Sequence, residues 1–283
     1  MTPERTSAYR DAPCRRRLGA VVIGALVAGV LAGSWLPDLS AATRVLLRLG
    51  VVLLGLRLSL GQLVDLGPGV LLAAAVTVGG TFAGTVWLGG RLGLPRGLTL
   101  LVAGGFAICG ASAIAAVEGV VDRDDEHVAT GVALVTLYGT LTMIALPLLG
   151  ASPEWIGLST HEVAQVAAAA GPAGLATAMA VKLTRVALLA PVVALVGRKR
   201  TAPPAFLLGF LAMVAVRSTG WVPAGVLDVV GVVTTVLPAA ALFGLGTAVR
   251  PAVLLRTGPR ALLLGFLSTV LVVGLGYLAL RVV

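Results

Sequence analysis

Apolar runs long enough to cross the hydrocarbon core of a membrane recur from one end of the chain to the other. The pattern predicts helical spans near residues 18–36, 41–60, 69–90, 97–121, 128–150, 173–197, 204–221, 225–249 and 259–282. These runs do not show the two-residue alternation of a membrane β-barrel. We therefore predict an all-α polytopic membrane protein with about nine full spans.

Composition supports this class. Of the 283 residues, 58% are hydrophobic and 12% are charged, which leaves too little charge to cover a soluble domain. Residues 1–17 are polar and basic, and we interpret them as a cytoplasmic tail before a single transmembrane domain at 18–283. The run at 18–36 is longer than the core of a secretory signal, so we expect it to remain as the first span.

The net charge of +9 raises the question of a nucleic-acid partner. The basic residues gather at the ends of predicted spans and do not form a face with interleaved aromatic residues. This distribution indicates membrane topology and no nucleic-acid partner. The two cysteines, Cys14 and Cys109, are too few for a disulfide framework or a metal cluster, and we expect no metal and no cofactor.

The stretch "STHEVAQVAAAAGP" (159–172) interrupts the series of spans. Residues 161–170 are too short to cross alone and end at Gly-Pro, a helix stop, so they either re-enter the membrane or form half of a broken span. Re-entry with a cytoplasmic N-terminus places most basic residues inside, among them Arg123, Arg198, Lys199, Arg200, Arg250, Arg256 and Arg260. It leaves Arg91, Arg96 and Arg281 in outer loops. A full crossing would move 198–200 and 250–260 outside, against the positive-inside bias, and we favour re-entry.

A weak internal repeat relates "LLGLRLSLGQLVDLGPGVLL" (53–72) to "LFGLGTAVRPAVLLRTGPRALL" (242–263). Each has Gly-Leu near a span end, a short link, and Gly-Pro at the start of the next span. Internal symmetry is common in secondary transporters, although chance recurrence in a chain rich in Gly and Leu gives the same pattern. The charge-based topology puts both links inside, whereas an inverted repeat needs them on opposite sides.

The segment "GGFAICGASAIAA" (104–116) is unusual for a membrane span because small residues fill its middle. Clustered glycines favour either an unwound point or a close helix–helix approach with an unbroken helix. If the helix restarts near Gly110, Ala111 and Ser112, free amide groups and a positive helix end would form an anion site at mid-membrane depth.

Two cations lie in the middle of the predicted span 173–197. Lys182 and Arg185 are one helical turn apart within "VKLTRVALLAP" (181–191). Charges at that depth are rare and face a cavity or a partner. They would either neutralise a bound anion or pair with an acidic residue such as Glu118, Glu162 or Asp228.

Polar residues of "HEVAQ" (161–165) are candidates for proton coupling. His161 and Gln165 share one face of a helix, and Glu162 suits its first turn. Gln165 stands where a zinc-protease motif would have its second histidine, which makes a zinc site improbable. Glu118 lies within an apolar run, so it could carry a proton or sit at the interface.

These segments together resemble the YeiH-type sulfate exporter family of bacterial inner-membrane proteins. The resemblance covers residues 40–283 and rests on "LLGLRLSLGQLVDLG" (53–67), "ICGASAIAAVEGVV" (108–121), "STHEVAQVAAAAG" (159–171), "VKLTRVALLAP" (181–191) and "LGTAVRPAVLLRTGPRALL" (245–263). The family is similar to the sodium/proton antiporter and bile-acid symporter superfamily. That likeness implies a secondary transporter with broken helices that cross near the bilayer centre.

We therefore expect a secondary transporter of a small anion, such as sulfate, a related oxyanion or a sulfonate, in the bacterial inner membrane. Gly110, Ala111 and Ser112 would bind the anion, Lys182 and Arg185 would neutralise it, and His161, Glu162, Gln165 or Glu118 would couple a proton. The alternative is a cation/proton antiporter of the same architecture. No paired catalytic motif indicates an enzyme. This interpretation allows four partners: the bilayer, the anion, a coupling proton or sodium ion, and a second copy of the chain.

Overall fold

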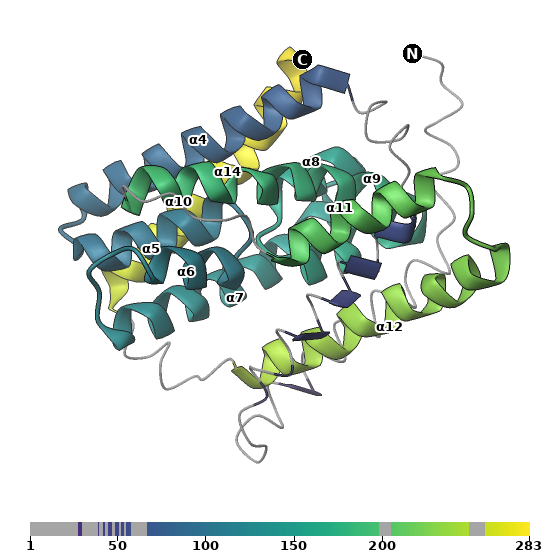
Figure 1. Ribbon diagram of the computed structural model, residues 1–283. Coiled ribbons are helices and arrows are strands. Elements are labelled where there is room, and N and C mark those ends of the chain that lie inside the picture. Colours follow the sequence, from purple (N-terminus) through teal and green to yellow (C-terminus); the bar gives the residue numbers. More distant parts are fainter. Residues whose placement is uncertain are drawn as a thin grey trace.

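The computed structural model describes residues 67–197, 205–248 and 258–283, together with a few residues between 28 and 57 (Figure 1). The part it describes is helical, as predicted. Its elements are η3 (Gly55–Arg57), α4 (Gly67–Arg91), α5 (Arg96–Ala107), α6 (Ala111–Glu118), α7 (Asp125–Leu148), α8 (Pro153–Ser159), α9 (Val163–Ala187), α10 (Leu189–Gly197), α11 (Ala205–Ser218), α12 (Ala224–Ala248) and α14 (Pro259–Val282).

Four segments of this part are long and apolar enough to cross a membrane: Gly67–Arg91, Asp125–Leu148, Ala173–Gly197 and Pro259–Val282. They coincide with predicted spans 69–90, 128–150, 173–197 and 259–282. The tail at 1–17 and the predicted span 18–36 lie almost wholly outside the described residues, and 41–60 is described only in part. The count of nine spans is therefore not confirmed.

Helices α4 and α14 run side by side in opposite directions along one flank of the molecule (Figure 1). Gly69, near the start of α4, lies against Val283, and Gly93, just after α4, faces Arg260 near the start of α14. Both helices begin at a Gly-Pro pair, as the repeat predicted. These two starts are at opposite ends of the molecule, which is the relation that an inverted repeat requires. The charge-based expectation that both lie on the same side is therefore wrong.

The predicted span 97–121 is wrong, because this segment turns back on itself. It forms two antiparallel helices, α5 and α6, which we call hairpin 1 (residues 96–118). Gly97 at its start lies against the Asp122 carbonyl, and Gly104 and Gly105 face the side chains of α6. The two alternatives predicted for the glycines therefore occur together: α5 and α6 approach closely, and the helix breaks at 108–110. Gly110 has a positive φ of 69°, a conformation that favours glycine.

Because hairpin 1 returns to its starting end, the assignment of Arg91 and Arg96 to the side opposite Arg123 is also wrong. Arg96 and Arg123 line one pocket, together with Val196 from the last turn of α10. Arg260 lies at the same end, beside Gly93. Basic residues from three separate places in the chain, Arg91 with Arg96, Arg123 and Arg260, are thus gathered at one end, which we call the basic end (residues 91–97, 120–124, 196–197 and 258–260).

A second re-entrant unit faces the first from the opposite end, as the favoured topology for 161–170 predicted. Its first arm is α8, a helix that the sequence interpretation missed, and its second arm is the first part of α9, up to Gly171. Gly171 has φ 64° and ψ 176°, and beyond it the chain reverses, so that Gly174 lies against Pro153 at the start of α8. We call residues 153–170 hairpin 2.

The two hairpins meet within the bundle, so the broken helices expected to cross instead touch at their tips. We define tip 1 as residues 108–111, which include the first residue of α6, and tip 2 as residues 160–162. An arm the length of α5 rises about 17 Å, roughly half of a hydrocarbon core. Backbone that is not helical is tolerated at such depth only where protein or water satisfies it.

Candidate substrate site at the hairpin tips

Direct contacts join the two tips. The backbone N–H of Ala111, the first residue of α6, donates to Glu162 Oε1 at 3.2 Å. The Glu162 side chain lies so close to Gly110 that a Cβ there would be 3.0 Å from Oε1. On the other side of the tips, the ring of His161 stands edge-on to Phe106, with centroids 4.5 Å apart. The predicted break and the predicted polar segment therefore form one buried cluster.

Lys182 holds the tips together from the second part of α9. Its Nζ donates to the Ile108 carbonyl of tip 1 at 2.8 Å and to the Thr160 carbonyl of tip 2 at 2.5 Å. The side chain is fully buried. Two carbonyls from interrupted helices thus take the place that an acidic partner would otherwise occupy.

Arg185 spans the same two helix ends one turn further along. Its guanidinium donates to the carbonyl oxygens of Phe106, Ala107, Gly157, Leu158 and Thr160. All three guanidinium nitrogens are used, and the side chain is fully buried. The last turn of a helix leaves carbonyls without intrahelical partners, and Arg185 supplies those partners for α5 and α8 together.

Glu162 occupies the opposite kind of position, at the N-terminal ends of two helices. It precedes α9, where it forms a capping box with Gln165, whose Oε1 accepts from the Glu162 N–H at 2.9 Å. Its own Oε1 accepts from the first residue of α6. The partial charges of helix ends favour this arrangement, with a carboxylate at two N-termini and two cations at two C-termini.

Two polar atoms of tip 2 are buried without a hydrogen-bond partner: His161 Nε2 and Glu162 Oε2. The other ring nitrogen of His161 is 3.4 Å from Thr142 Oγ1 on α7. Gln165 fits against Gly139 of α7, where any larger residue would collide with its amide. His161 and Gln165 are therefore packed between helices rather than along a lipid-facing edge.

Two of the predicted site residues lie apart from this cluster. The side chain of Ser112 is exposed, although its backbone belongs to the first turn of α6. Glu118 ends α6 at the basic end, where it pairs with Arg123. A helix as long as α6 places that carboxylate about 10 Å along its axis from tip 1. Cys109 is buried in the hydrophobic core.

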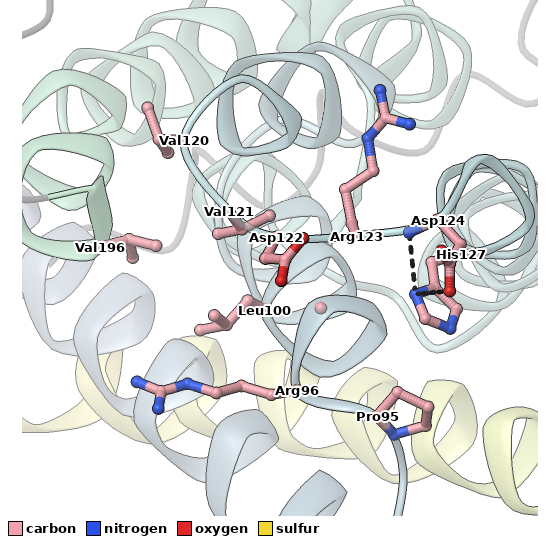
Figure 2. A pocket seen from close by; sticks show the side chains of 11 residues that line it. Pro95, Arg96, Leu100, Val120, Val121, Asp122, Arg123, Asp124, His127 and Val196 are labelled. Carbon is pink, nitrogen blue, oxygen red and sulfur yellow. Dashed lines mark hydrogen bonds and ion pairs between the residues drawn. The ribbon is translucent and has the colours of Figure 1, made fainter.

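A pocket of about 550 Å³ opens at the base of hairpin 1 (Figure 2). Charged side chains surround it, including Arg96, Asp122, Arg123 and Asp124. The Asp124 N–H donates to His127 Nδ1 at 3.4 Å at the start of α7. This pocket is separate from the tips, because its deepest residue on α5 is Leu100, two turns before tip 1.

The sequence interpretation missed a set of buried hydroxyl groups. Thr77 and Thr81 of α4 and Ser159 of α8 are fully buried, and their oxygens have no partner. Thr85, one turn further along α4, bonds to Ser268 of α14 at 3.0 Å. Threonines at 77, 81 and 85 recur at the helical spacing of one face, and that periodicity in an apolar span was the available signal.

An all-helical bundle with spanning helices and two interrupted hairpins defines a helical membrane protein. A family model described as "Conserved hypothetical protein 698" matches residues 15–265. A UPF0324 membrane protein of Corynebacterium glutamicum is 41% identical over 279 residues, covering 89% of this chain and 81% of the relative. The chain belongs to the UPF0324 family of membrane proteins, and the resemblance to the YeiH-type family is confirmed.

Relatives from other bacteria show similar coverage. A UPF0324 membrane protein of Pseudomonas putida is 36% identical over 287 residues, covering 91% of this chain and 81% of the relative. One from Bacillus cereus is 38% identical over 261 residues, covering 83% of this chain and 74% of the relative. No solved structure matches the chain significantly.

Proposed function

We propose that the protein is a secondary transporter of a small anion, with sulfate, a related oxyanion or a sulfonate as the substrate class. The observation that carries the proposal is the charge of the tips. Lys182 and Arg185 are buried there against one carboxylate, Glu162, in the part of the chain that the structure describes. The cluster is therefore net positive at the depth where transporters bind their substrates.

The backbone adds directed donors to this positive potential. The amide of Ala111 at the start of α6 is a group that binds oxyanions at helix N-termini. Because the nitrogens of Arg185 already donate to carbonyls, we assign the two cations an electrostatic role and assign contact with the anion to tip 1. Hairpins that enter from opposite ends suit alternating access around a fixed central site.

The proposal places the protein in the bacterial cytoplasmic membrane with the basic end inside. It also assigns the protein no enzymatic role, and coupling to a proton through tip 2. A cation/proton antiporter is the second candidate, because Glu162 Oε2 and His161 Nε2 are buried acceptors without partners that could hold a proton or a sodium ion.

Uptake in proteoliposomes separates the two candidates. Purified protein is reconstituted, and uptake of labelled sulfate, sulfite and the sulfonate isethionate is measured against protein-free vesicles, with and without sodium. We expect saturable uptake of at least one of these anions that does not require sodium. Proton movement driven by a sodium or potassium gradient, without any anion flux, would reject anion transport and favour the antiporter.

A further inference from the structure

We propose that Glu162 is a tethered substitute for the substrate anion: its carboxylate occupies the amide site of tip 1 until a proton releases it, so that one proton accompanies each anion. This inference rests on the proposed function and deepens it. It concerns what holds the site in the empty protein and which ion is coupled to transport.

The first argument is the position of the carboxylate. An oxyanion is expected at the N-terminus of α6, where free amides point away from the helix. That place holds Glu162 Oε1, which accepts from Ala111 at 3.2 Å. The carboxylate also lies directly against Gly110. A substrate anion and the Glu162 carboxylate cannot both contact this backbone, so they compete for it.

The second argument is that one oxygen of this buried carboxylate lacks a hydrogen-bond partner. Its Oε2 has no hydrogen-bond partner, and Glu162 is only 3% exposed. Among the described residues it forms no ion pair, because the nearby cations Lys182 and Arg185 donate to backbone carbonyls. A carboxylate with one of its two oxygens unsatisfied gains from protonation, which supplies a donor and removes the charge.

The third argument is charge balance. When the carboxylate takes up one proton, it becomes a neutral carboxylic acid, and the tips lose one negative charge. A monovalent anion then returns the cluster to its former net charge of one positive, and a dianion such as sulfate brings the net charge of Lys182, Arg185, Glu162 and the anion to zero, so neither exchange leaves an excess of negative charge. No oxidant, metal or other reactant is needed. Anion and proton would therefore move in the same direction.

Other ionisable groups lie around Glu162 and are alternative proton acceptors. They are His161 on tip 2, Cys109 on tip 1, and Lys182 and Arg185 on α9. The residues of α7 that face the tips are Val135, Gly139 and Thr142, which do not titrate. Of these ionisable groups, only Glu162 contacts the amide where the anion would bind, so its charge alone controls access directly.

The test compares the wild-type protein with Glu162→Gln in the proteoliposome assay, using sulfate and measuring internal pH with a trapped dye. Wild-type uptake should rise about tenfold for each unit that the pH falls while the carboxylate is mostly ionised, because one proton is bound. The Glu162→Gln protein should transport at a rate independent of pH and without proton entry, because an amide cannot ionise. Glu126→Gln, an exposed acid in the first turn of α7, is the matched control and should keep the wild-type profile.

The outcomes separate the two proposals. If wild-type protein takes up none of the three anions, the proposed function fails, and this inference fails with it. If wild-type protein transports sulfate but Glu162→Gln keeps its pH dependence and its proton entry, only this inference is overturned. If Glu162→Gln does not fold, sulfate is added to wild-type protein in unbuffered detergent solution and proton uptake is recorded. About one proton per sulfate bound supports the inference, and none overturns it.

Discussion

Arg185 allows the sharpest test of the tip architecture, through the substitution Arg185→Leu. The side chain supplies hydrogen-bond partners to five carbonyls at or just after the C-termini of α5 and α8, those of Phe106, Ala107, Gly157, Leu158 and Thr160. Leucine fills similar space but donates nothing. Neighbouring carbonyls one turn earlier are bonded by the chain itself, such as Gly104 by the Ile108 N–H, so they do not depend on Arg185.

The cost follows from those orphaned acceptors. A buried polar group left without a partner costs about 1–3 kcal/mol, and breaking one side of a buried charged network costs about 3–5 kcal/mol. We expect a loss near the second range, because removing the arginine also removes its own burial penalty. A loss of that size lowers the melting temperature by on the order of 10 °C. Arg185→Lys should fall between, since an ammonium keeps the charge but cannot bridge both helix ends with a planar fork.

The assay is a thermal melt of purified protein in detergent. Arg123→Leu is the matched control: it removes an arginine at the basic end, where ion pairs that are partly exposed contribute about 0–1 kcal/mol. An Arg185→Leu protein that melts within about 2 °C of the wild type would show that the carbonyls do not need the guanidinium. The bracing role of Arg185 would then be wrong.

Two further predictions concern the fit of the hairpins. Gly139→Val should push the Gln165 amide away from α7 and so lower both the melting temperature and anion uptake. Gly274→Val on α14 is the control, because open space surrounds Gly274 and the substitution should change neither quantity. Cysteines introduced singly at Arg96 and Arg123 in a cysteine-free background should react with a membrane-impermeant maleimide from the same side, which we expect to be the cytoplasm. Labelling from opposite sides would mean that residues 97–121 cross the membrane after all.

Several features of the site could be predicted from the sequence because local chemistry determines them. The cluster of glycines predicted the break near Gly110, where a positive φ is needed. The Gly-Pro pair at 171–172 predicted the end of the second arm, and Gly171 has a left-handed φ there. The short apolar run at 161–170 excluded a full crossing by these residues alone, and the positive-inside bias then favoured re-entry over half of a broken span.

The reversal of hairpin 1 could not be predicted from hydropathy. Residues 97–121 have the length of one crossing helix, and two short arms with a turn give the same apolar run. What distinguishes them is the contact between Gly105 and Ile114, which lie too far apart in sequence to meet within one continuous helix. The contact forms only because the second arm runs back along the first, and an average of hydropathy along the sequence does not record the direction of a helix.

The partners of the buried cations were hidden for a different reason. The sequence predicted acidic side chains as one kind of partner for Lys182 and Arg185, because a sequence identifies side chains by residue type. Their actual partners are backbone carbonyls, which every residue has, and only the breaks at tip 1 and tip 2 free them from helices. A mid-span arginine thus indicates an interrupted helix as much as an acid.

The same logic bears on how the empty site stays folded. Interrupting two helices within a membrane exposes four helix ends, and a site waiting for substrate would leave those ends unsatisfied. Here α9 supplies the cations for both C-terminal ends, and Glu162 supplies the anion for both N-terminal ends. Protonation can neutralise Glu162 without breaking the hydrogen bonds that hold the tips together, because the bonds from Lys182 and Arg185 to the carbonyls do not involve the Glu162 carboxylate. In the proposed mechanism, substrate would therefore exchange with Glu162 while Lys182 and Arg185 keep the tips together.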